Sequence, residues 1–378
     1  MKAGVYFSEH QDSFTAGKEA SAGAVEGSGP PVLTLAFTTD GYDQAQVLEG
    51  IKQNISFSLI AGFCCAGVVT SSGVHNQGVG VMTLSGDFRA STILQKGLSQ
   101  DPFSAGQKSG QFLLESGITQ GTAIVLPDGF QANISEMLRG IYSEMGSDFE
   151  YIGGGAGDNL KFFKTYQFTE QGISENALSA AVVEGLDFGV GIGHGWNPVG
   201  EPLVITRSEG KRVYEIDGSP AFLGYTKRLG QMTSDEFPAM AMKHPLGFPN
   251  ISGQYIIRDP LQVNNDQSMD FVTEVPSQAV GYIMEGRLEN LIQTAREASQ
   301  VAASSVSAPA FLLLFDCISR VLLMEDRFQE EIEAIRETVG REIPMIGALT
   351  FGEVGCYDRA PLFHNKTTVV AAGGTRST

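Results

Sequence analysis

The sequence has few of the residues, and none of the short motifs, that usually reveal a protein's chemistry. Its four cysteines include no C-x-x-C pair, so neither a zinc site nor a thioredoxin-type motif is supported. Its five histidines include no H-x-x-x-H pair, and no Cys–His cluster occurs. G-x-x-x-x-G-K-[ST] and G-x-S-x-G are also missing, which argues against a P-loop and a hydrolase elbow. We therefore expect no bound metal, no resident cofactor and no catalysis.

Positive charge and long apolar runs are also scarce. The chain carries 25 Lys and Arg against 43 Asp and Glu, a net charge of −18 that repels phosphate backbones and anionic lipid. The first ten residues, MKAGVYFSEH, lack the apolar core of a signal peptide, and Ala308–Phe315 is too short to cross a bilayer. We expect a cytoplasmic protein that binds neither nucleic acid nor membrane, and the few cysteines fit a reducing compartment.

Strand-like and helix-like segments alternate along most of the chain. Apolar runs predict buried strands at Val32–Thr38, Ala123–Leu126 and Ala310–Phe315, and helical spacing of apolar residues marks the segments between them. The length of 378 residues suggests two domains. We predict an α/β fold of two domains with mixed sheets flanked by helices, residues 1–217 and 218–378. The order of elements in 288–349 resembles that around 40–64, which indicates two pseudo-repeated halves.

Three apolar runs lead directly into glycine-rich turns. They are Phe57–Gly67 (FSLIAGFCCAG), Phe149–Asp158 (FEYIGGGAGD) and Ile343–Gly355 (IPMIGALTFGEVG). Glycine lets a backbone reach positive φ or approach another backbone or a ligand closely. The turns therefore predict either a cavity built from main-chain groups or tight joints with no ligand. The second turn is a poor nucleotide site, because G-x-G-x-x-G requires glycine where Asp158 stands.

The second half holds the constellation that looks most chemical. Asp316, Cys317 and Arg320 follow one predicted strand, and Glu353 follows the next in Gly352-Glu353-Val354-Gly355. If these strands are parallel neighbours, both groups emerge at the sheet edge where open α/β sheets bind ligands. Arg320 would then clamp a carboxylate and Glu353 an ammonium group, as an amino acid requires. The alternative is that Arg320 and Glu353 pair with each other and join two loops.

The chain resembles the FIST proteins, which carry paired FIST N and FIST C domains. The matching segments, each short, run in order through most of the chain: VLTLAF (32–37), LIAGFCCAG (59–67), VLPDG (125–129), IGGGAGD (152–158), YEIDGSPA (214–221), YIIRDPL (255–261), FDCISR (315–320), IGALTFGEVG (346–355) and FHNKT (363–367). The resemblance implies an intracellular sensory protein that binds a small ligand, with amino acids proposed. We expect no room for a fused output domain, so signalling would use a separate partner such as a histidine kinase.

The resemblance also carries an alternative and a departure. Some stand-alone relatives look like haem-binding nitric oxide sensors that act on a partner histidine kinase, and here His194 or His364 would hold the iron. Relatives typically have a G-C-S-T-A-G-E-like turn where this chain has Gly62-Phe63-Cys64-Cys65-Ala66-Gly67-Val68, which lacks the hydroxyls and the acid. We therefore expect ligand binding mainly in the second half of the chain. The expected ligand-binding residues are Cys317, Arg320, Gly352, Glu353, Gly355, Gly154 and Asp158.

Overall fold

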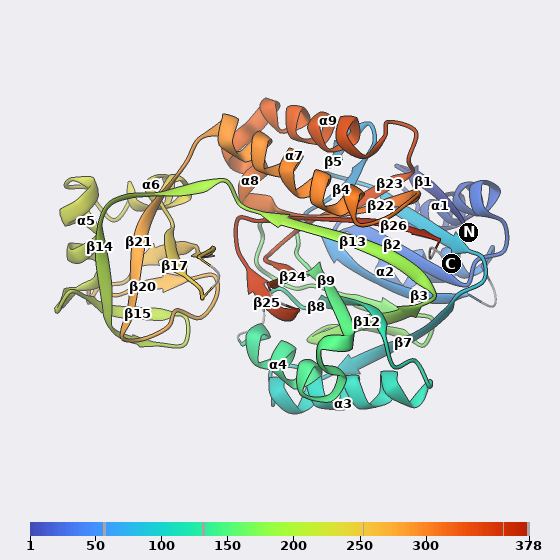
Figure 1. The fold of residues 1–378 in the computed structure, drawn as a ribbon, viewed down its shortest axis with the longest axis horizontal. Helices are drawn as coiled ribbons and strands as arrows, with labels where there is room; N and C mark the ends of the chain where they lie inside the picture. Colours follow the sequence, from blue (N-terminus) through green and yellow to red (C-terminus); the bar gives the residue numbers. More distant parts are fainter. Residues whose placement is uncertain (56–57, 131–132, 252, 358, 376–378) are drawn as a thin grey trace.

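The strands of the protein form four sheets, and three of these share one order of strands. The computed structural model describes residues 1–55, 58–130, 133–251, 253–357 and 359–375. Within these ranges the three similar sheets have six strands each and the fourth has eight. Helices cover the outer faces of the three similar sheets (Figure 1), so the predicted α/β fold with mixed sheets and flanking helices is confirmed.

Each similar sheet is built around one unit of chain. A unit runs strand, helix, strand, helix, strand, then a short hairpin and a last strand. Unit one is β1 (Lys2–Ser8), α1 (Ser13–Ser28), β2 (Leu33–Thr39), α2 (Gln44–Lys52), β3 (Leu59–Cys65), β4 (Gly67–Thr70), β5 (Gly73–His75) and β6 (Val79–Ser85). Unit two is β7 (Arg89–Lys96), α3 (Pro102–Glu115), β8 (Gly121–Pro127), α4 (Ile134–Met145), a 3-10 turn (Gly146–Asp148), β9 (Phe149–Gly154), β10 (Gln167–Thr169), β11 (Gly172–Ser174) and β12 (Ala177–Glu184).

Unit three repeats this order with one additional helix and one long insertion. It is β13 (Leu186–Gly193), α7 (Leu288–Ser304), β22 (Pro309–Cys317), α8 (Ile318–Met324), a 3-10 turn (Glu325–Arg327), α9 (Phe328–Val339), β23 (Met345–Thr350), β24 (Glu353–Tyr357), β25 (Ala360–His364) and β26 (Thr368–Thr375). The similar order of elements in 40–64 and 288–349 thus reflects the correspondence of units one and three. The repeat is threefold rather than twofold.

The units are interlocked because each gives its hairpin to another unit's sheet. The sheets run β1-β6-β2-β3-β10-β11, β7-β12-β8-β9-β24-β25 and β13-β26-β22-β23-β4-β5. Among the described residues, each of these three sheets has one parallel pair of strands, the central one: β2·β3, β8·β9 or β22·β23. The hairpin of unit one completes the sheet of unit three, that of unit three completes the sheet of unit two, and that of unit two completes the sheet of unit one. Each sheet therefore needs two units to form.

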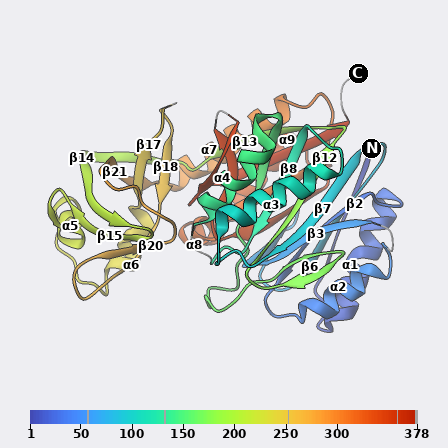
Figure 2. The same ribbon diagram turned by 90° about the horizontal axis from the view of Figure 1, so that it is seen from below.

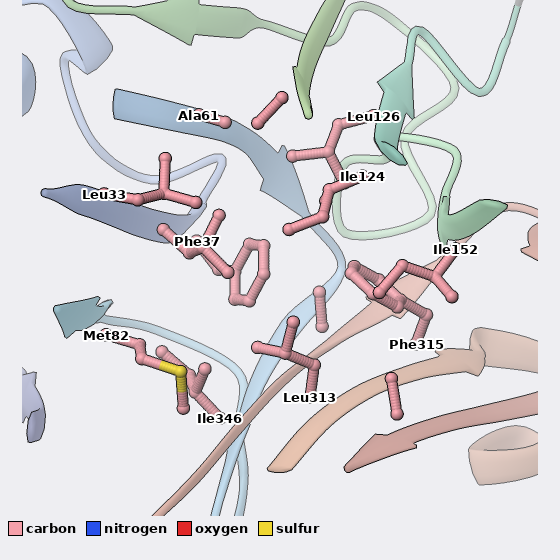
Figure 3. Close-up of a cluster of buried hydrophobic side chains, with 14 of the residues drawn as sticks. Leu33, Phe37, Ala61, Met82, Ile124, Leu126, Ile152, Leu313, Phe315 and Ile346 are labelled. Carbon is pink, nitrogen blue, oxygen red and sulfur yellow. The ribbon is translucent and has the colours of Figure 1, made fainter. Parts of the chain in front are cut away.

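The inner faces of the three sheets meet in one apolar core. Figure 3 shows side chains from all three converging there, among them Leu33, Ile124 and Leu313. Phe37 of β2 contacts Phe315 of β22 edge to face, with ring centroids 5.9 Å apart. Aromatic pairs in this geometry stabilise a core beyond the area that they bury. This common core makes the three units a single body.

Helix α3 begins where the sequence places its cap. The Asp101 carboxylate accepts a hydrogen bond from the Ser104 amide, and Pro102 is the first residue of α3. Helix α4 buries Ile134, Leu138 and Ile141, which recur at helical spacing and contact unit two's sheet. The part of this helix predicted at 131–132 lies outside the described residues.

Residues 196–286 leave the body and form the fourth sheet. This insertion contains β14 (Trp196–Glu209), β15 (Arg212–Ile216), β16 (Ser219–Pro220), α5 (Ala221–Leu229), α6 (Phe237–Lys243), β17 (Leu246–Pro249), β18 (Tyr255–Arg258), β19 (Pro260–Val263), β20 (Met269–Phe271) and β21 (Ala279–Gly286). We call it the fourth-sheet unit. Figures 1 and 2 show it at one end of the molecule, far from unit one.

The predicted domain boundary lies inside this unit. Asp217, the last residue of the predicted first domain, is in the turn between β15 and β16, which pair with each other. No helix among the described residues is long and apolar enough to cross a membrane.

Candidate functional site

The three glycine-rich turns lie at equivalent places, at the ends of β3, β9 and β23, and they meet. Their main-chain groups bond to one another: Gly157 N to Cys64 O (3.0 Å), Ala66 N to Leu349 O (3.1 Å), Gly155 N to Gly352 O (2.8 Å) and Phe351 N to Gly155 O (3.0 Å). The turns do converge, but these N–H and C=O groups are used in joining the three units. The interpretation of the turns as tight joints is the better one for these atoms.

Arg320, at the predicted site, is completely buried, and all five of its N–H groups are engaged. Nε donates to Glu331 Oε1 (3.1 Å) and lies 3.2 Å from Asp316 Oδ1, while Nη2 donates to Glu331 Oε2 (2.8 Å). The other N–H groups donate to the carbonyl oxygens of His194, Lys366 and Leu291. No donor is left for a ligand carboxylate, so the predicted clamp does not exist in this structure.

The carboxylates around Arg320 outnumber the guanidinium. Asp316, Arg320 and Glu331 have no exposed surface. Burial, and then the charge of Glu331, raise the pKa of Asp316 well above its usual range. Burial therefore favours the protonated form of Asp316.

Glu353 is buried beside this cluster and does not pair with Arg320. The condition set by the sequence analysis is met: β22 and β23 are parallel neighbours, which brings the two residues near each other. However, within the described residues the ion pairs of Arg320 are those with Asp316 and Glu331. Glu353 accepts hydrogen bonds from Thr350 Oγ1 (2.8 Å) and the Thr367 amide (3.1 Å). Burial raises the pKa of Glu353 to about 8. It is protonated in much of the protein at neutral pH, so it is a poor partner for an ammonium group.

The predicted glycines hold strands close together. A Cβ on Gly154 would lie 2.5 Å from Thr350 Cγ2, and one on Gly355 would lie 2.4 Å from Ile192 Cδ1. Gly352 has φ +93, and a Cβ there would lie 2.3 Å from the Phe363 ring. Gly352 borders the small cavity described below, whose lining includes neither Gly154 nor Gly355.

Asp158 shapes a loop. Its carboxylate accepts hydrogen bonds from the amides of Lys161, Phe162 and Phe163 at 2.8–2.9 Å. We call residues 159–163 the aromatic loop. Phe162 of this loop contacts Phe351 edge to face, with ring centroids 5.3 Å apart. Leu160 and Phe162 have φ of 57° and 51°, which costs energy for residues with side chains. Asp158 thus positions the aromatic loop and does not itself line the cavity.

A small cavity of about 70 Å³ lies between the body and the fourth-sheet unit. Two predicted residues, Cys317 and Gly352, line it. Apolar walls come from both parts of the molecule: Leu160, Phe162, Met242, Leu261, Val272, Ile318, Leu322 and Phe351. Its polar side chains, besides Cys317, are Asp259, Ser319 and Asn365. The predicted site is therefore near a real cavity, but part of the wall, formed by Met242, Asp259, Leu261 and Val272, belongs to the insertion.

Asp259, in the wall of this cavity, forms an ion pair with Lys366, which does not itself line the cavity. Lys366 Nζ lies 3.0 Å from Asp259 Oδ2 and 3.3 Å from Met242 Sδ. Lys366 is completely buried, and its φ is 56°. Burial raises the pKa of Asp259, and the charge of Lys366 opposes that shift. We did not predict either residue, although both lie in family-like segments, YIIRDPL and FHNKT.

The two histidines offered for haem do not fit an axial ligand. His194 Nδ1 accepts a hydrogen bond from the Trp196 amide (3.0 Å), and the Tyr255 backbone bonds the ring as well. His364 is 1% exposed, its Nε2 lies 3.3 Å from the Gly355 carbonyl, and Tyr357 packs on its ring. Burial lowers the pKa of His194 to about 4 and that of His364 to about 3. Both rings are neutral and occupied by the protein itself.

The thiols are similarly unreactive. Burial raises the pKa of Cys64 to about 12 and that of Cys317 far above its ordinary value. Cys65 is also buried, with a pKa well above its usual value. Within the described residues no three His, Cys, Asp or Glu side chains are placed to hold a metal ion.

Comparison with protein families identifies the chain. A model of the FIST N domain matches residues 32–219, and a model of the FIST C domain matches residues 221–356. The chain belongs to the FIST family. FIST domains are sensory domains that bind small ligands in signal transduction. The two matches meet at residues 219–221, at the start of α5 in the fourth-sheet unit.

Other similarities are distant. The uncharacterized protein MJ1623 of Methanocaldococcus jannaschii is 24% identical over 359 residues, covering 85% of this FIST chain and 68% of the relative. A structure described as "Cyanuric acid hydrolase: evolutionary innovation by structural concatenation" aligns with a TM-score of 0.37 at 8% identity, over 99% of both chains. PurLQS from Thermotoga maritima aligns with a TM-score of 0.25 at 11% identity, over 99% of this chain and 72% of that one.

Proposed function

We propose that this FIST protein is a cytoplasmic, non-catalytic sensor of a small amino acid. The amino acid binds in the cavity between the body and the fourth-sheet unit. The observation that carries this proposal is the ion pair that Asp259, in the wall of a mainly apolar cavity, forms with the buried Lys366. The buried, protonated thiols support a role without catalysis.

A zwitterion is the ligand class that such an ion pair suits. A ligand with one charge would leave either Asp259 or Lys366 buried without a partner, which is strongly unfavourable. An amino acid replaces one ion pair by two, since its ammonium group binds Asp259 and its carboxylate binds Lys366. Asn365 adds a polar group at the same wall, and Leu261 and Val272 offer apolar contacts to a short side chain.

The cavity's size favours a small ligand. A volume of 70 Å³ holds roughly five water molecules, at about 15 Å³ of such volume for each. That is close to the number of heavy atoms in the smallest amino acids. A larger ligand requires the aromatic loop to move, and the positive φ of Leu160 and Phe162 means that this loop gains by relaxing.

Signalling follows from the position of the cavity. The body and the fourth-sheet unit are joined where β13 passes into β14 and where β21 passes into α7. A ligand that contacts both parts favours the arrangement in which both walls are close, and only such a preference shifts a conformational equilibrium. A separate signalling protein, such as a histidine kinase, would detect that arrangement.

The test is the melting temperature of purified protein with each common amino acid, and with hemin in one further sample. A ligand at about 100 times its dissociation constant adds roughly 2.7 kcal/mol, which raises the melt by degrees. We expect selective stabilisation by small amino acids and none by hemin. Asp259→Asn abolishes the shift, while Asp270→Asn, which alters a surface pair with Arg212 in the same sheet, retains it. Absence of any shift, or an equal shift in both variants, contradicts the proposal.

A further inference from the structure

A separate groove of about 570 Å³ lies where the body meets the fourth-sheet unit. We call it the α7 groove. One wall is a single face of α7, and its residues are Asn290, Gln293, Thr294, Glu297, Ala298 and Val301. The opposite side includes Tyr357 of β24, Gln254 and the segment 192–197, which joins β13 to β14.

We propose that the α7 groove binds an extended peptide segment of a signalling partner. Three independent features of the groove support this occupant: a free strand edge, the chemistry of its lining and its length.

The first feature is the edge of β13. Within the described residues β13 pairs with β26 alone, so it is an edge strand of unit three's sheet. Ile192 and Gly193, at the end of this edge, line the groove. Figure 1 shows β13 running beside α7 along its length. An unpaired edge offers alternating N–H and C=O groups, and an extended peptide adds to it as a further strand.

The second feature is the lining. Amide side chains on three sides of the groove, Asn197, Gln254, Asn290 and Gln293, can each donate and accept hydrogen bonds, as peptide groups require. Glu297 is the only residue of the lining with a formal charge at neutral pH, since His194 is neutral. The groove therefore suits a neutral or basic segment and disfavours an acidic one. Val301, 53% exposed at one end, offers an apolar contact.

The third feature is the length. Asn290 and Val301 are eleven residues apart on α7, which corresponds to about 16 Å along the helix axis at 1.5 Å per residue. An extended chain advances about 3.3 Å per residue, so roughly five residues span the groove. A segment of this size is typical of peptide recognition by strand addition.

Arg320 connects this groove with the ligand cavity. Its Nη1 donates to the His194 carbonyl, in the groove wall, and to the Lys366 carbonyl, beside the cavity. Its Nη2 donates to the carbonyl of Leu291 on α7. Movement of Lys366 on binding a ligand therefore reaches both walls of the groove. This coupling rests on the proposed function, whereas peptide binding by the groove does not.

The experiment selects random peptides of about seven residues, long enough to cover the groove, on the wild-type protein, with counter-selection on Gln293→Trp. Affinities of synthetic copies are then measured by fluorescence anisotropy. We expect Gln293→Trp and Glu297→Lys to weaken binding at least about tenfold. Gln300→Trp, an exposed position of the same helix outside the groove, changes it less than about twofold. Methylation of peptide amides should abolish binding at alternate positions only.

Three results overturn the groove proposal. One is that no selected peptide depends on Gln293, and a second is that amide methylation has no alternating effect. The third is that no peptide binds, whereas neutral sugars bind to the wild-type protein and Gln293→Trp abolishes their binding. Addition of the amino acid identified by melting tests the coupling separately. If peptide affinity is unchanged by it, the groove stands and the coupling is wrong. If no amino acid binds at all, peptide binding still tests the groove.

Discussion

Units one and three have the same strands and the same pair of covering helices, yet their interiors are chemically opposite. Where β2 and β3 of unit one end, Thr38, Cys64 and Cys65 are buried, and the Thr38 hydroxyl bonds the neutral Gln44. Where β22 and β23 of unit three end, the chain buries charges. The charged residues with no exposed surface, among those described, all belong to unit three: Asp316, Arg320, Glu331, Glu353 and Lys366.

This difference between units one and three indicates that the shared fold supplies the scaffold. The insertion determines where charged groups can be buried with partners. Buried charges are tolerated only with partners. Unit three supplies those partners through its additional helix α8, which carries Arg320, and through Asp259 of the fourth-sheet unit. Unit one has neither. We therefore expect ligand chemistry in unit three and a structural role for the turn of unit one.

Among the variants that test this comparison, removal of Arg320 should lower the free energy of unfolding most. Arg320→Met leaves Asp316 and Glu331 buried without a cation, and breaking a buried pair typically costs about 3–5 kcal/mol. Thr38→Val in unit one removes a neutral hydrogen bond and should cost about 1 kcal/mol. Urea unfolding measures both. Equal losses would mean that the charged cluster contributes no more than the neutral contact of unit one.

A second variant sharpens this result. Adding Glu331→Gln to Arg320→Met removes one of the stranded carboxylates, so part of the lost stability should return. Arg327→Met, which breaks only exposed pairs with Glu289 and Glu330, should leave the unfolding curve unchanged. If the double variant is less stable than Arg320→Met, the cluster is not held by its charges.

An intermediate effect is expected at the junction of the three units. Gly153 has φ +148, and a Cβ there would lie 2.0 Å from the Val125 carbonyl oxygen. Gly153→Ala should therefore cost about 3 kcal/mol, from backbone strain and collision together. Gly172 has a similar φ of +144 with no atom within 4 Å of a Cβ, so Gly172→Ala should cost about 1 kcal/mol. Equal thermal melts of the two variants would refute close packing at the junction.

The smallest expected effect is the pH dependence of the unfolding free energy that Glu353 of unit three causes. Burial raises the pKa of Glu353 to about 8, so between the pKa of an unfolded glutamate and about 8 the folded state binds more protons than the unfolded state. This contribution to stability is fully present below the unfolded pKa and is lost as pH rises through 8. The slope for one group is at most about 1.4 kcal/mol per pH unit.

Glu353→Gln should remove this slope, because glutamine cannot ionise. The informative comparison is the difference in unfolding free energy between variant and wild type from pH 6.5 to 8, in which the contributions of His194 and His364, common to both proteins, cancel. Gln44→Glu, at the neutral site of unit one, should introduce a slope of the same sign. A pH-independent difference for Glu353→Gln would show that Glu353 is ionised in the folded protein.

Several features of the site could be predicted from the sequence because they depend on local pattern. The buried strands that end in the three glycine-rich turns, and the parallel pairing of β22 and β23, follow from apolar runs and chain order. The roles of Arg320 and Glu353 could not be predicted. Whether Arg320 meets a ligand or Glu331 depends on α9, which follows α8 in the chain and folds back beside it. The same holds for Asp259 and Lys366, which are 107 positions apart.

The sequence by itself determined the class of fold, the family and the three turns, because periodicity and glycine act over a few residues. Only the tertiary structure decided that the units are three, that they exchange hairpins and that an insertion completes the cavity lined by Cys317 and Gly352. The physical reason is that strand exchange and burial of charge are settled between distant segments. A short motif specifies its own backbone, but it does not specify which part of the chain will satisfy its charges.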